Sequence, residues 1–190
     1  MCDFFVRYGT NQFERTLTSI MTIEKDEVSE QFIIALEKHT GILVKISYAY
    51  ARTYHEREDL INDIIFQLWK SFTSFKGQSK MSTWMYRVAL NTCMNYDLKK
   101  KKETIIFSDD LTDFRLNEVI EINLTEQDQH SVLYDCINEL DSFNKAIVLL
   151  YLDGNSHEEI SLVTGISITN VGTRMGRIKE QLKKLVVNKY

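Results

Sequence analysis

Apolar and polar residues follow a helical period most clearly between residues 58 and 72. The apolar residues recur at three- and four-residue steps, which place them on one stripe of an α-helix. Turn-forming residues at 73–79 end the pattern, so we predict a helix followed by a loop. The stripe consists of Leu60, Ile61, Ile64, Ile65, Leu68, Trp69 and Phe72, and the opposite face carries Asp59, Asn62, Asp63 and Gln67.

A second helix is predicted directly after this loop, and the four lysines at 99–102 indicate its end. Upstream, one helix is predicted to open at Ser29 and to be interrupted at Gly41, with another helix after the glycine. These two upstream helices carry no chemical motif, so we expect them to complete a hydrophobic bundle around the stripe. The inward residues of the helix after the loop would be Trp84, Met85, Val88, Ala89 and Tyr96.

Residues 131–190 predict four shorter helices. Asp141 or Ser142 would cap the second of them, and Gly154 would end it. Ser156-His157-Glu158-Glu159 is a capping-box pattern that opens the third, and Gly165 allows a tight turn before Ser167 caps the last. Helix, glycine turn and capped helix form the layout of a helix-turn-helix. Inward positions would be Leu133, Ile137 and Leu140, then Phe143, Ile147, Leu150 and Tyr151, then Ile160 and Val163, and finally Val171, Met175, Ile178 and Leu182.

Composition agrees with an all-α protein. The chain has 190 residues, no proline and only seven glycines, so few residues would break a helix. This length suits one medium domain or two small ones. The formal net charge of −4 argues against a protein that grips nucleic acid by bulk electrostatics. The charge is segregated, because residues 103–130 carry eight acids and one arginine, whereas residues 174–190 carry six bases and one glutamate.

Other function classes find little support in the sequence. Cys2, Cys93 and Cys136 lie far apart, and the histidines are scattered, so we expect free thiols and no metal site. No apolar run is long enough to span a membrane, and no signal peptide is recognisable, so we expect a cytoplasmic protein without membrane insertion. No nucleophile–base pair or phosphate-binding glycine loop can be assembled, so we expect neither an enzyme nor a cofactor.

Two stretches carry a resemblance to a known family. EDLINDIIFQLW, then FKGQSKMSTWMYRVALN, then the lysine run closely resemble region two of bacterial RNA polymerase sigma factors. The match is to the extracytoplasmic-function (ECF) group of the sigma-70 family, and the block from Val132 to Tyr190 resembles sigma region four. The resemblance implies two small helical domains, at 29–102 and 131–190, joined by an acidic linker at 103–130. Residues 1–28 would be an N-terminal extension, to which we assign no function.

The resemblance implies a role for the polar face of the helix at 58–72. In sigma factors this helix docks on the coiled coil of the largest polymerase subunit, where acids meet arginines. Carried over by position, Asp59 and Asp63 would be the charged contacts and Gln67 a polar neighbour. Asn62 stands where the family more often has glutamine, and it is shorter.

The loop and the helix that follows it would melt and read the promoter −10 element. Aromatic and small polar side chains suit unstacked bases, which are stacked on and hydrogen-bonded at their edges. Trp84 is interpreted mainly as a core residue. The lysines at 99–102 suit either the C-terminal helix dipole or DNA phosphates. The predicted −10 contacts are Phe75, Lys76, Ser79, Ser82, Thr83, Arg87, Asn91 and Asn95.

The last helix would enter the major groove at the −35 element. Arginine and asparagine can pair with base edges, and threonine can contact phosphate or a thymine methyl group. Gly172 and Gly176 depart from the family, which usually has longer residues there, and imply fewer base contacts or an unusually close approach of the backbone. The predicted −35 contacts are Thr169, Asn170, Thr173, Arg174 and Arg177.

The expected partners are therefore core RNA polymerase and promoter DNA, with an anti-sigma factor as a further candidate and a monomer as the free state. In relatives the linker threads through polymerase channels, and a solvated acidic spacer is the alternative reading of residues 103–130. The alternative function is a helix-turn-helix regulator that works without polymerase. Residues 156–185 suit either function, whereas the EDLINDIIF and TWMYRVALN stretches favour the sigma factor.

Overall fold

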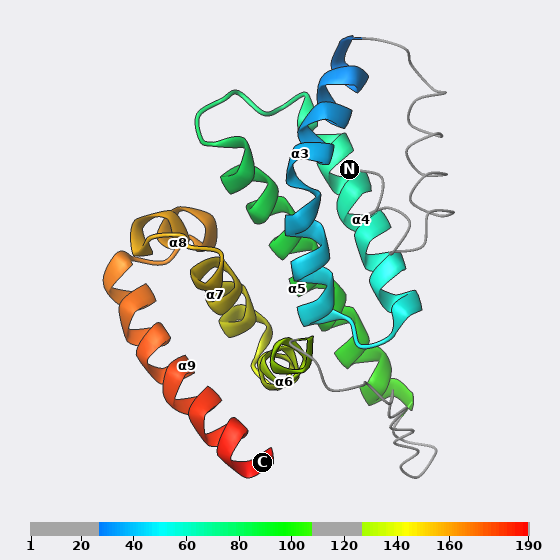
Figure 1. The fold of residues 1–190 in the computed structure, drawn as a ribbon. Helices are drawn as coiled ribbons and strands as arrows, with labels where there is room; N and C mark the ends of the chain where they lie inside the picture. The colour runs from blue at the N-terminus through cyan, green and yellow to red at the C-terminus, as the bar shows by residue number, and fades with distance from the viewer. Residues whose placement is uncertain (1–26, 108–126, 190) are drawn as a thin grey trace. The chain divides into compact units, whose positions relative to one another are not determined.

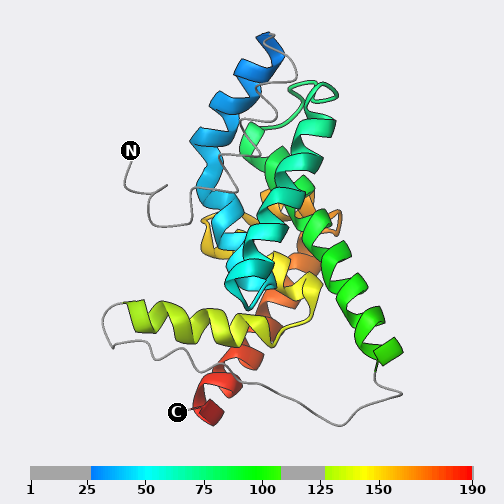
Figure 2. The ribbon, with the colours of Figure 1, turned by 90° about the vertical axis from the view of Figure 1, so that its right-hand side faces the viewer.

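The computed structural model describes residues 27–107 and 127–189, and all regular secondary structure in those ranges is helical. The chain divides into two compact units, Met1–Thr92 and Cys93–Tyr190 (Figures 1 and 2). The predicted all-α class is confirmed for these ranges, and the greater part of the predicted linker lies outside them. The helices are α3 (Glu27–Tyr50), α4 (Tyr54–Phe72), α5 (Met81–Phe107), α6 (Gln127–Asn138), α7 (Ser142–Leu152), α8 (His157–Thr164) and α9 (Ile168–Lys189).

Helix α3 is one continuous helix, so the predicted interruption at Gly41 is wrong. The glycine is exposed, and a β-carbon built on it would meet nothing within 4 Å. A glycine inside a helix costs only about 1 kcal/mol relative to alanine. The buried face keeps its helical phase on both sides of the glycine, and this burial outweighs the local cost. The buried large side chains of this face are Phe32, Leu36, Ile42, Leu43, Ile46 and Tyr50.

Helix α4 packs beside α3, as both views show (Figures 1 and 2). It begins at a complete capping box, in which Thr53 Oγ1 accepts from the Glu56 amide and the Glu56 carboxylate accepts from the Thr53 amide. The predicted stripe is buried at Leu60, Ile64, Ile65 and Leu68. Phe32 of α3 lies edge-on to Trp69 and Phe72, with ring centroids 5.1 and 5.2 Å away. These contacts fix the rotation of α4 about its axis and so decide which face it exposes.

Helix α5 runs through the four lysines and ends at Phe107, so the predicted end at residues 99–102 is wrong. Lysine is a good helix former, and no glycine or proline interrupts this part of the chain. The last turn of α5 contains no basic residue, which removes the proposed interaction of the lysines with the helix C-terminus. Four exposed cations therefore lie inside a helix.

The second unit contains α6 to α9 together with α5 from Cys93 onward, and the ends of α7 and α8 follow the predicted signals. Asp141 caps α7 by accepting from the amides of Phe143 and Asn144, at 3.1 and 2.9 Å. Ser156 forms a capping box with Glu159 at the start of α8, and Gly165 ends that helix with φ +77°. The core of the unit includes Ile137, Ile147, Leu150, Ile160, Val171 and Ile178. Tyr151 was predicted to face inward and is instead 39% exposed.

Two cysteines belong to the core of this unit. Cys93 and Cys136 are free and buried, as the wide spacing of the cysteines predicted. Burial raises the pKa of the Cys93 thiol, which keeps that group protonated at neutral pH. In the described parts of the chain, no helix is long and apolar enough to cross a membrane, and no group of histidine, cysteine and carboxylate side chains could hold a metal ion.

Candidate protein and nucleic-acid interfaces

The exposed face of α4 carries the residues predicted to meet a protein partner. Asp59, Asp63 and Gln67 are exposed, and Asn62 is half-buried. All four lie away from the face that α4 packs against α3, because that face is occupied by the buried leucines and isoleucines. The structure therefore places the predicted side chains on one accessible face of a rigid helix.

Phe66 is the residue of this face that the sequence analysis missed. Its side chain is 57% exposed, although phenylalanine is usually buried. It follows Asn62 and Asp63 by four and three residues, so it lies among them on the helix surface. The available signal was its position outside the buried stripe. An exposed aromatic ring surrounded by polar groups is typical of the centre of a protein interface.

The loop between α4 and α5 combines a tight turn with an aromatic contact. Gly77 has φ +68°, a left-handed conformation that favours glycine. The ring of Phe75 lies 5.2 Å from the half-buried ring of Trp84, which also meets Phe72 at 6.2 Å. Trp84 thus ties the loop to the core, and Phe75 sits on that aromatic support rather than pointing freely into solvent.

The other predicted −10 residues form a polar surface around this support. Lys76 and Ser79 are exposed on the loop, and Ser82 and Thr83 are half-buried in the first turn of α5. Arg87, Asn91 and Asn95 are exposed and follow at four-residue steps, so they form one line along the helix. Lys99 to Lys102 continue α5 as exposed cations, and the Lys100 ammonium lies 5.8 Å from the ring centre of Tyr96.

Helices α8 and α9 form the predicted helix-turn-helix. Ser161 Oγ donates to the Ile166 carbonyl across the turn, at 2.5 Å, and the Asn170 amide donates to Ser167 Oγ at 3.3 Å. A β-carbon on Gly172 would lie 3.7 Å from the His157 ring, so the two helices approach each other at this point. The pKa of the Glu158 carboxyl is lowered, first by a hydrogen bond from its own backbone amide and then by one from Ser156.

The residues predicted to contact DNA from α9 differ in their surroundings. Thr169, Asn170, Thr173 and Arg177 are exposed, and Thr173 Oγ1 donates to the Thr169 carbonyl at 3.0 Å. Arg177 has no ion pair or hydrogen bond to a described residue. The sequence spacing therefore predicted correctly that these four side chains of α9 are exposed, and their contact with DNA stays a prediction.

Arg174 is the exception on this helix. It is half-buried, its Nη1 donates to Asn144 Oδ1 at 3.2 Å, and its guanidinium lies 5.0 Å from the ring centre of Phe143. Lys179 makes a similar contact nearer the other end of α7, 4.6 Å from the ring centre of Tyr151 and 3.2 Å from its hydroxyl. Both cations thus fasten α9 to α7. Spacing along α9 could not reveal this, because the partners lie about thirty residues earlier.

Family comparisons match both units. A family model described as "Sigma-70 region 2" matches residues 35–103, and one described as "Sigma-70, region 4" matches residues 130–182. The first match covers most of α3, all of α4 and most of α5, and the second covers α7, α8 and most of α6 and α9. The candidate interfaces on α4, on α5 and on α9 all fall within matched residues.

Curated relatives agree with these matches. The chain is 30% identical to the ECF RNA polymerase sigma factor SigM of Bacillus subtilis over 132 residues, which cover 69% of this chain and 80% of SigM. It is 28% identical to SigW of the same organism over 156 residues, covering 75% of this chain and 81% of SigW. The ECF sigma-E factor of Haemophilus influenzae is 27% identical over 138 residues, covering 67% and 73% of the two chains.

Two solved structures share the fold. The sigma factor RpoE of Bartonella quintana, in complex with the anti-sigma factor NepR, gives a TM-score of 0.60 at 18% identity and covers 83% of this chain and 94% of RpoE. CnrH, in complex with the cytosolic domain of CnrY, gives a TM-score of 0.61 at 15% identity and covers 95% of this chain and all of CnrH.

Proposed function

This chain belongs to the ECF group of the sigma-70 family and directs transcription initiation, and from that premise we propose which of its surfaces meet polymerase and promoter. The face of α4 with Asp59, Asn62, Asp63 and Gln67 docks on the coiled coil of the largest polymerase subunit. The loop at 73–80 and the start of α5 melt and read the −10 element. The exposed face of α9 reads the −35 element.

One observation carries the docking proposal. Asp59 and Asp63 are exposed on the face that α4 turns away from its own core, one helical turn apart. Two carboxylates at this spacing can meet two cations on a partner helix and so fix the register of docking. Phe66 follows Asp63 by three residues on the same face and supplies an apolar contact beside these charges, where water exclusion strengthens the neighbouring ion pairs.

The −10 proposal rests on the combination of a supported aromatic ring with polar groups. Phe75 packs on Trp84 and can present a face for a flipped base without losing its support. Lys76 and the line of Arg87, Asn91 and Asn95 offer hydrogen bonds to bases and phosphates of a single strand. The exposed lysines at 99–102 extend this surface with groups suited to phosphates.

The −35 proposal rests on the helix-turn-helix. Thr169, Asn170, Thr173 and Arg177 form the exposed surface of α9, which a major groove can admit. Arg174 belongs to the same surface by spacing. Its contacts with Phe143 and Asn144 favour a positioning role, in which it holds the recognition helix in place for its neighbours.

We also propose that polymerase unlocks DNA binding. The net charge of −4 and the eight acids at 103–130 leave the free chain a poor ligand for duplex DNA. Within a Debye length of about 8–10 Å, the linker acids can compete with phosphates for the basic side chains. Core polymerase would draw the linker into its channels and hold the two reading domains at promoter spacing. Their binding then becomes bivalent, and affinity rises without new base contacts.

An anti-sigma factor is a further proposed partner. RpoE, whose fold this chain shares, was solved with the anti-sigma factor NepR. A protein that covers the docking face of α4 would exclude polymerase and keep the chain inactive. We propose that the free chain is monomeric and acts in the cytoplasm, where polymerase is found.

Run-off transcription tests the proposed function. Purified core polymerase, with and without this chain, is supplied with a promoter library, and transcripts are sequenced. We expect defined start sites only when the chain is present. A polymerase-independent regulator would instead bind specific duplexes without core polymerase and would not direct core polymerase to defined start sites. That result would refute the docking proposal.

A separate measurement tests the linker. Promoter affinity is compared for the free chain, for a variant with the linker acids replaced by their amides, and for the holoenzyme. We expect weak binding by the free chain, stronger binding by the neutralised variant and the strongest by the holoenzyme. Tight and sequence-specific binding by the free wild-type chain would contradict the proposal that polymerase unlocks DNA binding. Equal binding by the free wild-type chain and the neutralised variant would show that the linker acids do not compete with DNA.

A further inference from the structure

Gly176 lies in the middle of α9, where no contact within the described parts of the chain requires a glycine. The glycines with positive φ in the described parts of the chain are Gly77, Gly154 and Gly165, so Gly176 has an ordinary helical backbone. Apart from its own helix backbone and its two chain neighbours, a β-carbon built on it would meet no atom of a described residue within 4 Å. Alanine would fit and would favour the helix. The missing side chain is therefore explained neither by strain nor by packing.

Gly172 provides the contrast one turn earlier. A β-carbon there would face His157 of α8, at 3.7 and 3.8 Å from two atoms of its ring. These are ordinary contact distances, so Gly172 lies on the side of α9 that meets α8. Gly176 is exposed to solvent. Gly172 therefore faces His157, whereas Gly176 faces solvent.

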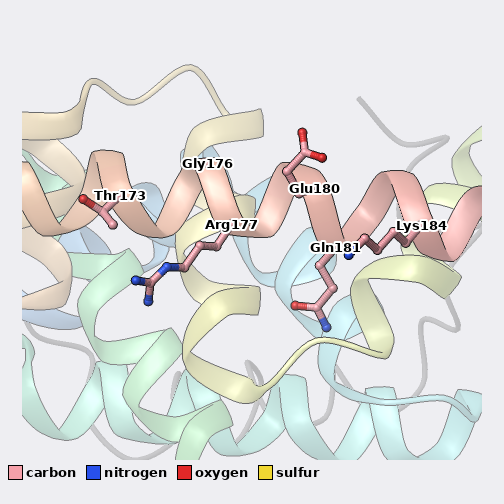
Figure 3. A pocket seen from close by; sticks show the side chains of 6 residues that line it. All are labelled: Thr173, Gly176, Arg177, Glu180, Gln181 and Lys184. Atoms are coloured by element: carbon pink, nitrogen blue, oxygen red, sulfur yellow. The ribbon is translucent and has the colours of Figure 1, made fainter.

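An open groove runs along the exposed face of α9 at Gly176. Figure 3 shows the bare helix backbone at Gly176, flanked by side chains that leave the helix on either side of it. The groove offers hydrogen-bond donors from Arg177, Gln181 and Lys184 and acceptors from Glu180 and Gln181. It is lined by Thr173, Gly176, Arg177, Glu180, Gln181 and Lys184.

The mixture of donors and acceptors indicates what the groove can hold. Glu180 would repel a phosphate, whereas base edges in a major groove present both donors and acceptors. Arginine pairs with guanine O6 and N7, and a carboxylate accepts from the cytosine amino group. Glu180 contacts Lys183 at 3.1 Å, but both side chains are largely exposed, and such surface pairs are weak enough to be exchanged.

We propose that Gly176 is a close-approach point, at which the base edges of the −35 duplex come against the backbone of α9. Arg177 and Glu180 then read a guanine and a cytosine on either side of the bare backbone. A β-carbon at residue 176 would hold the duplex away from both side chains. This inference deepens the proposed function and rests on it, because it assumes that α9 enters the −35 major groove.

The test uses holoenzyme assembled with the wild-type chain, with G176A or with G172A. Each holoenzyme selects from duplex promoters randomised at the −35 element, and affinities are then measured for the sequence that the wild type prefers and for an unselected sequence. We expect G176A to bind the preferred sequence about tenfold more weakly and to change the selected bases. Binding of the unselected sequence should stay within about twofold, because phosphate contacts are sequence-independent.

G172A is the matched control. Both alanines favour the helix, so both variants should raise the thermal midpoint of the second unit by a few degrees. G172A should leave affinity and selected sequence unchanged, because its methyl group faces His157. Loss of DNA binding in G176A, despite a more stable fold, separates a recognition defect from a folding defect.

Two results for G176A would overturn the inference: an unchanged affinity and selected sequence, or an equal loss on preferred and unselected duplexes. A wild-type holoenzyme that transcribes but selects no −35 sequence would refute the proposed role of α9, and the inference with it. Failure of the wild-type chain to activate core at all would refute the proposed function as a whole. These outcomes are distinguishable from one another.

Discussion

Helices α4 and α9 present two charged surfaces that helical spacing predicted in the same way. In the structure the charged side chains of the two helices have different surroundings. On α4, Asp59 and Asp63 point away from the core and are exposed. On α9, Arg174 and Lys179 are bound to aromatic rings of α7, and Arg177 remains exposed. Spacing shows which face a residue occupies. It does not show whether a long side chain folds back along that face onto a neighbouring helix.

The difference follows from side-chain length. An aspartate is too short to reach past its own helix, so its exposure can be inferred from its position on the helix. Arginine and lysine have flexible stems that can lie along apolar surface while their charged ends find partners. The cations of α9 can therefore contribute to the stability of the second unit as well as to the DNA binding that we propose.

Charge reversal on α4 is expected to have the largest effect. The double variant D59K/D63K should weaken binding to core polymerase by at least about 3 kcal/mol, or roughly 100-fold, because each removed ion pair becomes a repulsion. Binding is measured by titrating labelled chain with core. The fold should be intact, because both side chains are exposed.

The matched control is E37K, which reverses an exposed acid on α3. It changes the net charge by half as much and lies outside the proposed interface. A loss in E37K about half as large as the loss in the double variant would show a general electrostatic effect. Unchanged affinity in the double variant would contradict the assignment of α4.

Alanine substitutions of the two arginines of α9 should affect different properties: R177A should mainly affect promoter binding, and R174A should mainly affect stability. R177A should lower affinity for the preferred promoter by about 1–3 kcal/mol and relax the base preference at one position, with little effect on stability. R174A should lower the free energy of unfolding by about 1–2 kcal/mol, because it loses a hydrogen bond and a cation–π contact. Its weaker promoter binding should be nearly uniform across sequences.

A double-mutant cycle tests the contact directly. If Arg174 acts through Asn144, the stability losses of R174A and N144A should be clearly less than additive. Additive losses, together with a base-specific defect in R174A, would show that Arg174 contacts DNA directly. Spacing along the helix would then predict the role of the charged residues equally well on α9 and on α4.

The smallest expected difference between α4 and α9 is the loss of stability when the N-terminal cap of each helix is removed. T53A removes one half of a complete capping box and should cost about 1 kcal/mol of the stability of the first unit. S167A removes a single hydrogen bond of 3.3 Å and should cost about 0.5 kcal/mol. Chemical denaturation of each variant measures these values. A larger loss for S167A would show that the start of α9 is held more firmly than its contacts indicate.

Much of the fold could be predicted from the sequence, because its strongest signals are local. The stripe at 60–68, the capping box at Ser156 and the glycine turn at Gly165 each depend on residues within one or two turns, and all are confirmed. The predicted helix ends are wrong where burial or helix propensity outweighs a local helix-ending signal. Gly41 and the four lysines were read as ends of helices, but continuous burial in α3 and good helix propensity in α5 extend both helices.

For the candidate sites, the exposure of a residue was predictable to the level of a helix face. The exposed acids of α4 and the polar residues of α9 lie where their spacing placed them. Spacing did not assign the surroundings of Phe66 or Arg174, and the family resemblance left Gly176 open between fewer base contacts and a close approach of the backbone. The structure shows that Phe66 and Gly176 are exposed and that Arg174 has partners on another helix. These surroundings depend on residues far away in the sequence, so spacing along one helix does not reveal them.

The continuation of α5 through Lys99 to Lys102 changes what those four charges can do. Consecutive helical residues point about 100° apart, so four of them spread over about 300° and encircle the rod as a collar. A row of cations on one side would grip a strand in a single orientation. A collar attracts a polyanion from almost any direction and exerts little torque about the helix axis. It can guide a strand along α5, and in the −10 interface that we propose, Asn91 and Asn95 would set the angular register of that strand.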